Sequence, residues 1–256
     1  MPLTAITREI NADISSCELT FLPRVDIDVD LALQQHQQYQ SVLSSLGCDV
    51  VVVPTEPGLA DSVFVEDTAL VLDEVAVLLR PGAASRLPEI AGIEDILQQH
   101  RTLKSIQPPG TLDGGDLLRL DRVIFAGLST RSNQSGIEQL RNIVTEYGFS
   151  VVTIESTKCL HLKSAVSEVA PGTLLINPDW VSSAAFQEYE LIDIDEEEVH
   201  AANALMVGRS VVYPRSFPRT TDKLIARGID VISIDLSELQ KAEGAVTCCS
   251  LIYTAP

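Results

Sequence analysis

Four short segments of the chain carry ionisable or nucleophilic side chains within otherwise apolar runs. They are DSVFVEDTALVL (61–72), TLDGGDLL (111–118), LHLKSAV (160–166) and VTCCSLIY (246–253). A cysteine attacks only as a thiolate, so a nearby imidazole or cation must lower its pKa. A carboxylate that accepts the second imidazole N–H holds the histidine in one tautomer. Together, the four segments supply the parts of a thiolate nucleophile system.

Each segment also has a purely structural interpretation when it is taken alone. Glu66 and Asp67 fit a solvated acidic turn, and Asp113 with its two glycines fits an Asp-Gly hairpin. His161 fits a core histidine, and the paired cysteines at 248–249 fit small core residues. If 247–254 is a strand, adjacent side chains point to opposite faces. We then expect at most one of the two thiols in any pocket.

The acidic side chains in these segments outnumber what one cysteine and one histidine require. A guanidinium group is planar, has five N–H donors and pairs bidentately with carboxylates. Several acids beside a thiolate are electrostatically unfavourable unless a cation is bound between them. The surplus of carboxylates therefore favours a small cationic guanidino compound as the substrate.

The composition limits the class of protein. The 256 residues include 18 Lys and Arg against 36 Asp and Glu, a formal net charge of −18, and 45% are hydrophobic. This argues against wholesale disorder, against nucleic acid as a partner and against an anionic membrane surface. The N-terminus lacks signal-peptide features, and no stretch approaches the ~18 apolar residues of a membrane span. We expect a cytoplasmic protein that folds as one domain.

The elements that must position these residues alternate along the chain. Helical patterns centre near residues 40, 93, 140, 184 and 222, with the second over roughly 87–100 and the third over roughly 133–147. Repeated units at this spacing suggest a closed ring or propeller, whereas an ordinary open α/β sheet explains the alternation equally well. A hairpin is expected around 73–74, between strands over 64–72 and 75–80. Other strands are expected over 49–54, 117–120, 123–127, 149–154, 173–178, 189–194, 203–208, 210–214, 230–235 and 247–254.

Six segments occur in an order that resembles one enzyme family. They are DSVFVEDTA, RPGAASR (80–86), LDGGD, GLSTRSNQSG (127–136), LHLKS and TCCS. The chain resembles the dimethylarginine dimethylaminohydrolases, guanidino-group-modifying enzymes, over essentially its whole length. The resemblance implies a five-bladed α/β propeller (pentein) with pseudo-five-fold symmetry, formed by a single catalytic domain over 1–256. It also implies hydrolysis of asymmetric dimethylarginine or monomethylarginine to L-citrulline and an amine, through a covalent cysteine thiouronium intermediate.

The same resemblance implies roles for individual residues. Cys248 matches the nucleophile, His161 the general acid and base, and Asp113 the carboxylate that orients the histidine. Neither a cofactor nor a metal is implied. The implied substrate contacts are Glu66 and Asp67 to the guanidinium, Arg86 and Arg131 to the α-carboxylate, Asp61 to the α-amino group, Leu19 in a lid loop, and Ala242 where the family tends to carry a larger apolar residue.

Three other functions are compatible with parts of the pattern. An arginine deiminase-like hydrolase would use the same nucleophile on another guanidino substrate. A zinc-binding protein would use Cys248, His161 and an acid, although no paired ligand spacing supports it. A catalytically silent binding module would not need to retain every candidate residue. The chain is expected to act as a monomer or a homodimer.

Overall fold

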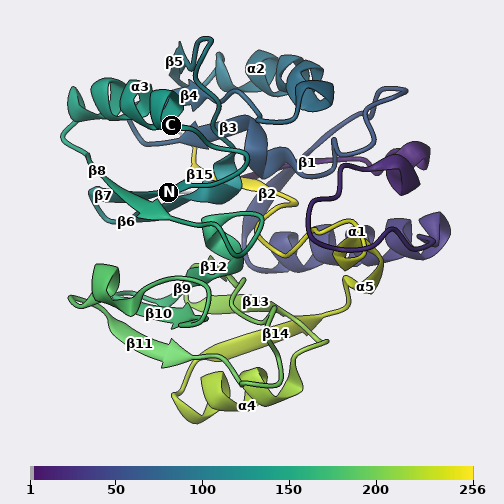
Figure 1. Ribbon diagram of the computed structural model, residues 1–256. Helices are drawn as coiled ribbons and strands as arrows, with labels where there is room; N and C mark the ends of the chain where they lie inside the picture. Colours follow the sequence, from purple (N-terminus) through teal and green to yellow (C-terminus); the bar gives the residue numbers. More distant parts are fainter. Residues whose placement is uncertain (1–2, 256) are drawn as a thin grey trace.

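Residues 3–255, which the computed structural model describes, form five three-stranded sheets (Figure 1). We call these sheets blades 1 to 5. In every blade the central strand is antiparallel to the strand before it and parallel to the strand after it. Because a parallel pair needs a crossover connection, a helical segment follows each central strand.

The strands and crossovers of the blades have the following bounds. Blade 1 contains β3 (Ala69–Val71), β4 (Val75–Leu78), the 3-10 helix η3 (Ala84–Ile90), α2 (Ala91–Leu97) and β5 (Thr102–Ser105). Blade 2 contains β6 (Leu117–Leu120), β7 (Val123–Leu128), α3 (Gln134–Thr145) and β8 (Ser150–Glu155). Blade 3 contains β9 (Val166–Ala170), β10 (Thr173–Ile176), the 3-10 turn η6 (Ser183–Phe186) and β11 (Glu190–Asp193). Blade 4 contains β12 (Leu205–Val207), β13 (Ser210–Pro214), α4 (Pro218–Ala226) and β14 (Asp230–Ile234).

Blade 5 joins the two ends of the chain. It contains β15 (Leu251–Thr254), β1 (Leu3–Arg8), α1 (Val29–Ser45) and β2 (Cys48–Val53). The strand β1 pairs with β15 on one side, with Leu3 opposite Thr254, and with β2 on the other side. The short helix α5 (Ser237–Gln240) leads from blade 4 towards β15 and contacts α1.

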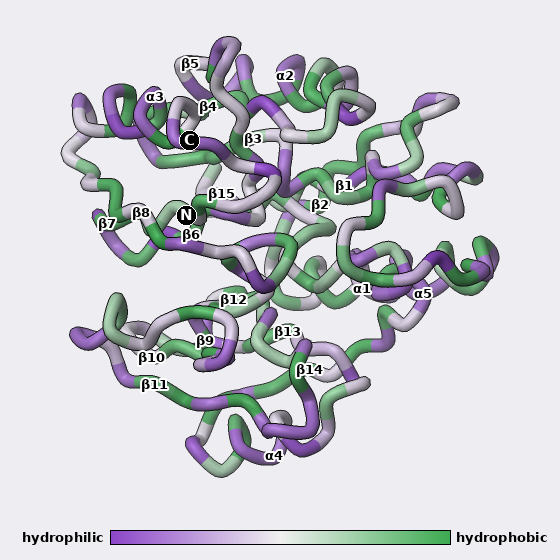
Figure 2. Tube along the Cα trace, in the orientation of Figure 1, coloured by the Kyte–Doolittle hydropathy of each residue, from purple (hydrophilic) through white to green (hydrophobic). Residues whose placement is uncertain are grey.

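The crossover helices bury one face against the sheets. Tyr39 and Leu43 of α1 are fully buried, and hydrophilic and hydrophobic residues alternate along the helices in Figure 2. Asp28 caps α1 by accepting a hydrogen bond from the Leu31 N–H at 3.0 Å. Gly47 follows α1 with a φ of +88°, a left-handed conformation that glycine adopts without strain.

The predicted repeat is confirmed, and so is the closed arrangement, because β15 of blade 5 contacts β3 of blade 1. The open sheet is therefore wrong. The helix expected near residue 184 is a single 3-10 turn, Ser183–Phe186. The helix expected over 87–100 begins as a 3-10 helix that contains Pro88, since proline removes a backbone donor.

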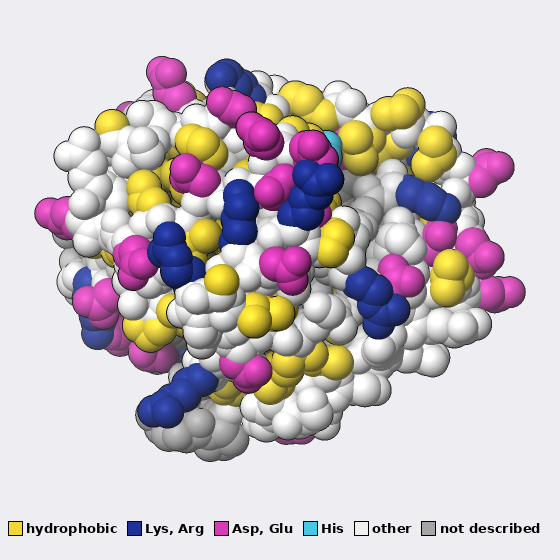
Figure 3. All heavy atoms as spheres, turned by 90° about the horizontal axis from the view of Figure 1, so that it is seen from below, with side chains coloured by type: hydrophobic (Ala, Val, Ile, Leu, Met, Phe, Trp, Pro, Cys, Tyr) yellow, Lys and Arg dark blue, Asp and Glu magenta, His cyan; other side chains and the backbone are white. Residues whose placement is uncertain are grey.

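The surface carries interspersed charged and hydrophobic side chains on the face drawn in Figure 3. No helix within residues 3–255 is both long and apolar enough to cross a membrane. All five cysteines lie in this described part of the chain, and none of them forms a disulfide.

Candidate active site

The ionisable side chains singled out from the sequence lie in short turns that precede the first strand of a blade. Glu66 and Asp67 lie in the 3-10 turn η2 (Val65–Thr68), directly before β3. Asp113 precedes the 3-10 turn η4 (Gly114–Asp116), directly before β6. His161 precedes the 3-10 turn η5 (Leu162–Ser164) before β9, and Cys248 lies in a turn shortly before β15. The turn η4 contacts both η2 and η5, so the ring of blades brings these side chains together.

Two strand predictions are wrong at this point. Residues 65–68 form a turn, in which Glu66 and Asp67 are both buried, and Cys248 and Cys249 precede the last strand. The solvated acidic turn is also wrong. The alternating apolar residues around Glu66 resemble a strand because a 3-10 turn is too short to have a periodicity of its own.

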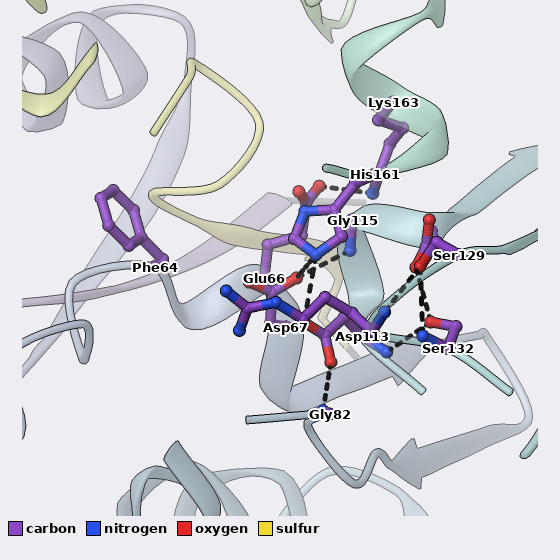
Figure 4. A network of polar contacts seen from close by, with 12 residues as sticks. Phe64, Glu66, Asp67, Gly82, Asp113, Gly115, Ser129, Ser132, His161 and Lys163 are labelled. Carbon is purple, nitrogen blue, oxygen red and sulfur yellow. Dashed lines mark hydrogen bonds and ion pairs between the residues drawn. The ribbon is translucent and has the colours of Figure 1, made fainter. Parts of the chain in front are cut away.

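His161 and Asp113 form a buried pair. The Nε2 atom of His161 lies 3.0 Å from Oδ2 of Asp113, and the other carboxylate oxygen accepts the Gly82 N–H at 2.7 Å (Figure 4). Burial favours the neutral imidazole, but the charges of Asp67, Asp113 and Asp116 outweigh it and raise the pKa of His161 to about 9. The imidazole is therefore protonated at neutral pH. The predicted pairing is present, and the catalytic roles of the two residues stay predictions.

The two glycines of LDGGD allow close packing instead of a hairpin turn. A Cβ atom added to Gly115 would lie 2.4 Å from Nδ1 of His161. A Cβ atom added to Gly114 would lie 1.9 Å from the backbone oxygen of Glu66. Because real Cβ atoms do not approach other atoms so closely, only glycine fits at either position.

Asp116 is fully buried and connects three parts of the site. Its carboxylate accepts hydrogen bonds from Oγ of Ser129 and Oγ of Ser132, each at 2.6 Å, and from the Leu162 N–H at 2.9 Å. Oγ of Ser132 also accepts the Asp113 N–H at 3.0 Å. Burial raises the pKa of Asp116 to about 6. The sequence analysis assigned no role to this residue, although it lies within LDGGD.

Asp67 is held by an arginine. Its Oδ2 lies 2.7 Å from Nη1 of Arg86, and its Oδ1 accepts the Gly115 N–H at 2.8 Å. Burial favours the neutral carboxyl group, but the charges of His161 and Arg86 lower the pKa of Asp67 to about 2. Arg86 also forms an ion pair with Glu89 at 2.9 Å. The expected contact of Arg86 with a substrate carboxylate stays a prediction, because its guanidinium contacts protein acids here.

Glu66 contacts Lys163 and the turn of residues 246–249, which contains Cys248. Its carboxylate forms an ion pair with Nζ of Lys163 at 2.5 Å and accepts a hydrogen bond from Oγ1 of Thr247 at 2.9 Å. The Glu66 N–H also donates to the backbone oxygen of Cys248 at 3.1 Å. Lys163 was missed in the sequence analysis, although it lies within LHLKS.

The two adjacent cysteines differ in burial, as expected, although they lie in a turn and not in a strand. Cys249 is fully buried in the core, whereas Cys248 is partly accessible and lines the same cleft as His161. Burial is the main cause that raises the pKa of Cys248 to about 12, and the charges of Glu66 and Asp67 add to it. The thiol is therefore protonated at neutral pH.

The cleft is narrow, with a cavity volume of about 20 Å³. Seven of the ten predicted site residues line it, namely Cys248, His161, Asp61, Asp67, Arg86, Arg131 and Ala242. Glu66 and Asp113 contact lining residues from behind, and Leu19 packs against the hydrophobic core. The sequence analysis missed Phe64, Glu18, Leu160, Glu243 and Gly244, which also line the cleft.

A family model described as "N,N dimethylarginine dimethylhydrolase, eukaryotic" matches residues 10–253. The chain belongs to the dimethylarginine dimethylaminohydrolase family. It is 36% identical to the Pseudomonas aeruginosa N(G),N(G)-dimethylarginine dimethylaminohydrolase over 228 residues, which cover 88% of this chain and 90% of the relative. It is 33% identical to the Streptomyces coelicolor enzyme of the same name over 248 residues, with 96% and 95% covered.

Solved structures extend the comparison to the fold. The P. aeruginosa dimethylarginine dimethylaminohydrolase in complex with citrulline has a TM-score of 0.94 at 33% identity, covering 99% of this chain and all of that chain. The N-terminal domain of ArgZ, a cyanobacterial arginine dihydrolase, has a TM-score of 0.86 at 21% identity, covering 100% and 99%. The predicted pentein propeller is therefore confirmed.

Three side chains in and behind the cleft offer atoms that metals bind. Oxygens of Asp67 and Asp113 and a ring nitrogen of His161 lie within 4.8 Å of one another. These side chains are already paired within the protein, since His161 contacts Asp113 and Asp67 forms an ion pair with Arg86. Cys248, the ligand expected for the zinc alternative, is outside this group.

Proposed function

We propose that this protein hydrolyses Nω-methylated L-arginine, asymmetric dimethylarginine and monomethylarginine, to L-citrulline and dimethylamine or methylamine. One observation carries the proposal: an accessible thiol, an imidazolium and carboxylates line a single cleft in a chain of this family. The alternative of an arginine deiminase-like activity is not favoured, because the named relatives of high identity are dimethylarginine enzymes.

The charges of the cleft explain how the nucleophile forms. In the free protein the pKa of Cys248 is raised to about 12 and the pKa of His161 to about 9, so both groups hold their protons. A guanidinium bound beside Asp67 and Glu66 offsets the negative charges that disfavour the thiolate. Substrate binding thus lowers the pKa of Cys248, and its proton leaves to solvent while His161 stays protonated.

The covalent chemistry then proceeds in two halves. The Cys248 thiolate attacks the central guanidinium carbon, and the imidazolium of His161 donates its proton to the departing amine. An S-alkylthiouronium is left on the sulfur. The neutral imidazole next takes a proton from water, whose oxygen adds to the same carbon. This adduct collapses with cleavage of the C–S bond, which regenerates the thiolate, and loss of the remaining hydroxyl proton to solvent leaves citrulline.

The charged residues of the cleft match the α-amino, α-carboxylate and guanidinium groups of the proposed substrate. Asp61, which is buried and lines the cleft, is assigned to the α-amino group, and Arg131 and Arg86 are assigned to the α-carboxylate. Asp67 and Glu66 are assigned to the guanidinium. Ala242 is assigned to an apolar contact with the substrate, and Leu19 to the loop that covers it.

The proposal places the whole activity in one catalytic domain over 1–256, of which residues 1, 2 and 256 lie outside the described residues. The substrate is a small molecule, and the protein acts as a monomer or homodimer without a cofactor. Five unpaired cysteines support a reducing, cytoplasmic location.

Citrulline release tests the proposal. The purified protein is incubated with asymmetric dimethylarginine, monomethylarginine or arginine, alongside the Cys248→Ser variant. We expect release from the methylated substrates and none from the variant. A kcat/KM for arginine well above that for dimethylarginine would overturn the assignment of the substrate.

A further inference from the structure

The carboxylate of Glu243 binds three consecutive backbone N–H groups of the N-terminal loop. Its oxygens accept hydrogen bonds from the N–H of Thr20 at 2.9 Å, Phe21 at 2.5 Å and Leu22 at 2.6 Å. Figure 1 shows this loop (purple) beside the C-terminal segment that precedes β15 (yellow). Successive N–H groups that converge on one point form an anion-binding arrangement, and here the protein supplies the anion itself.

The backbone of Glu243 supports a specific role. Its φ is +58°, in the left-handed region, and within residues 3–255 Asp121 is the one other non-glycine residue with a positive φ. Side chains with a Cβ atom rarely adopt this conformation, and such positions cluster at functional sites. Glu243 also lines the catalytic cleft, next to Gly244.

The loop that Glu243 holds also contacts the proposed substrate-binding residues. The Glu18 N–H donates to both carboxylate oxygens of Asp61, at 3.0 and 3.2 Å. Arg131 donates from Nη2 to Oγ1 of Thr20 at 3.1 Å. The loop therefore meets the two side chains assigned to the α-amino and α-carboxylate groups, and it has no hydrogen bond to Cys248 or His161.

We propose that Glu243 is a positioning residue that determines affinity for the α-amino acid end of the substrate. Its carboxylate keeps residues 18–22 against Asp61 and Arg131, and the chemistry at the guanidinium carbon does not depend on it. This inference rests on the proposed function for its substrate. Glutamate is required because a glutamine amide presents one acceptor oxygen, and its NH₂ group would face N–H donors.

The Glu243→Gln variant tests the role by separating KM from kcat. We expect KM for asymmetric dimethylarginine to rise about tenfold, the factor that corresponds to one charge-assisted hydrogen bond, with kcat within about twofold. Glu238→Gln is a matched control, because the Glu238 carboxylate accepts the Asp28 N–H at 2.8 Å but lies outside the cleft lining. Its KM should stay unchanged.

Two further measurements exclude a general loss of structure. The rate at which 2-chloroacetamidine, a small amidine without amino acid groups, inactivates the enzyme should be the same in Glu243→Gln and wild type. Glu243→Asn, whose side chain tolerates the left-handed backbone but is one methylene shorter, should raise KM without lowering the melting temperature. An unchanged KM in Glu243→Gln, or slower inactivation by the amidine, would overturn the role.

Hydrogen exchange gives a readout that needs no turnover. The amides of residues 20–22 should exchange faster in Glu243→Gln than in wild type. In Glu238→Gln they should exchange at the wild-type rate. Unchanged exchange in Glu243→Gln overturns the inference even if the enzyme is active. If the wild-type protein releases no citrulline, the proposed function is contradicted. Faster exchange in Glu243→Gln would then still show that Glu243 holds residues 20–22 in place.

Discussion

The segments before β9 and before β12 occupy equivalent places in neighbouring blades, yet they carry different chemistry. The first presents His161 to the cleft, with a protonated ring among acids. The second presents Asn203, whose amide donates to the Lys163 oxygen and to Oγ1 of Thr247, each at 3.0 Å. Asn203 also accepts the Thr247 N–H at 3.2 Å. Blade 4 thus offers a neutral amide that hydrogen-bonds to the turn containing Cys248. The other four blades offer a thiol or ionisable side chains.

This contrast teaches that the repeated fold supplies positions and not roles. Each blade is preceded by one short segment near the cleft. The side chain in that segment determines whether it is suited to react, to bind a ligand or to stabilise its neighbours. We therefore expect changes at Cys248 and His161, in the reactive segments, to alter turnover and its pH dependence. Changes at Asn203, in the supporting segment, should alter mainly the stability of the protein.

The largest effect is expected at the nucleophile. Cys248→Ser should lower kcat by at least about 10³-fold, because a serine hydroxyl ionises far less readily than a thiol. Cys249→Ser should retain most of the activity, since this side chain is buried away from the cleft. Steady-state citrulline release measures both. The reverse pattern would exchange the roles of the two cysteines.

The next largest effect is expected at the segment before β9. His161→Ala should slow the chemical step by about 10²- to 10⁴-fold, the usual contribution of a general acid and base. Substrate binding should change little, because no substrate contact is assigned to the imidazole. Single-turnover kinetics separate the two quantities. Equal loss of binding and chemistry would mean that the ring mainly shapes the cleft.

The pH profile distinguishes the reactive segments from the supporting one. The active form combines a Cys248 thiolate with a protonated His161, and kcat/KM reports groups of the free enzyme. With pKa values of about 12 and about 9, kcat/KM should rise about tenfold per pH unit below pH 9 and level off above it.

In Asp113→Asn the plateau should begin at a lower pH, because Asp113 helps to raise the pKa of His161. Asn203→Ala should leave the position of the plateau unchanged. A flat profile between pH 6 and 8 in the wild type would show that the thiolate already exists before the substrate binds.

The smallest effect on rate is expected in blade 4. Asn203→Ala removes three hydrogen bonds and leaves buried partners unsatisfied, which should lower the free energy of unfolding by about 1–3 kcal/mol. The turnover of the folded protein should fall by less than about tenfold. Denaturant unfolding and citrulline release measure the two. A loss of activity as large as that of His161→Ala would make Asn203 part of the reaction.

Hydrophobic periodicity was enough to predict the repeat, because helices such as 134–145 bury one regular face. It was misleading at residues 65–68, since a 3-10 turn between two apolar stretches has the same pattern as a strand. The site residues that belong to recognisable segments, such as Cys248 and His161, could be named in advance. Lys163, Asn203 and Glu243 could not be assigned, because their partners are distant in the sequence and only the folded ring brings them near.

The pairing of β1 with β15 makes the position of Cys248 depend on two strands from opposite ends of the described residues. Cys248 lies three residues before β15, and the partner of that strand is β1, about 240 residues earlier in the chain. A polypeptide that stops after blade 4 would hold the imidazole and the acids but would lack the sulfur. Cleavage between blade 4 and β15 would therefore separate the proposed nucleophile from the other proposed site residues.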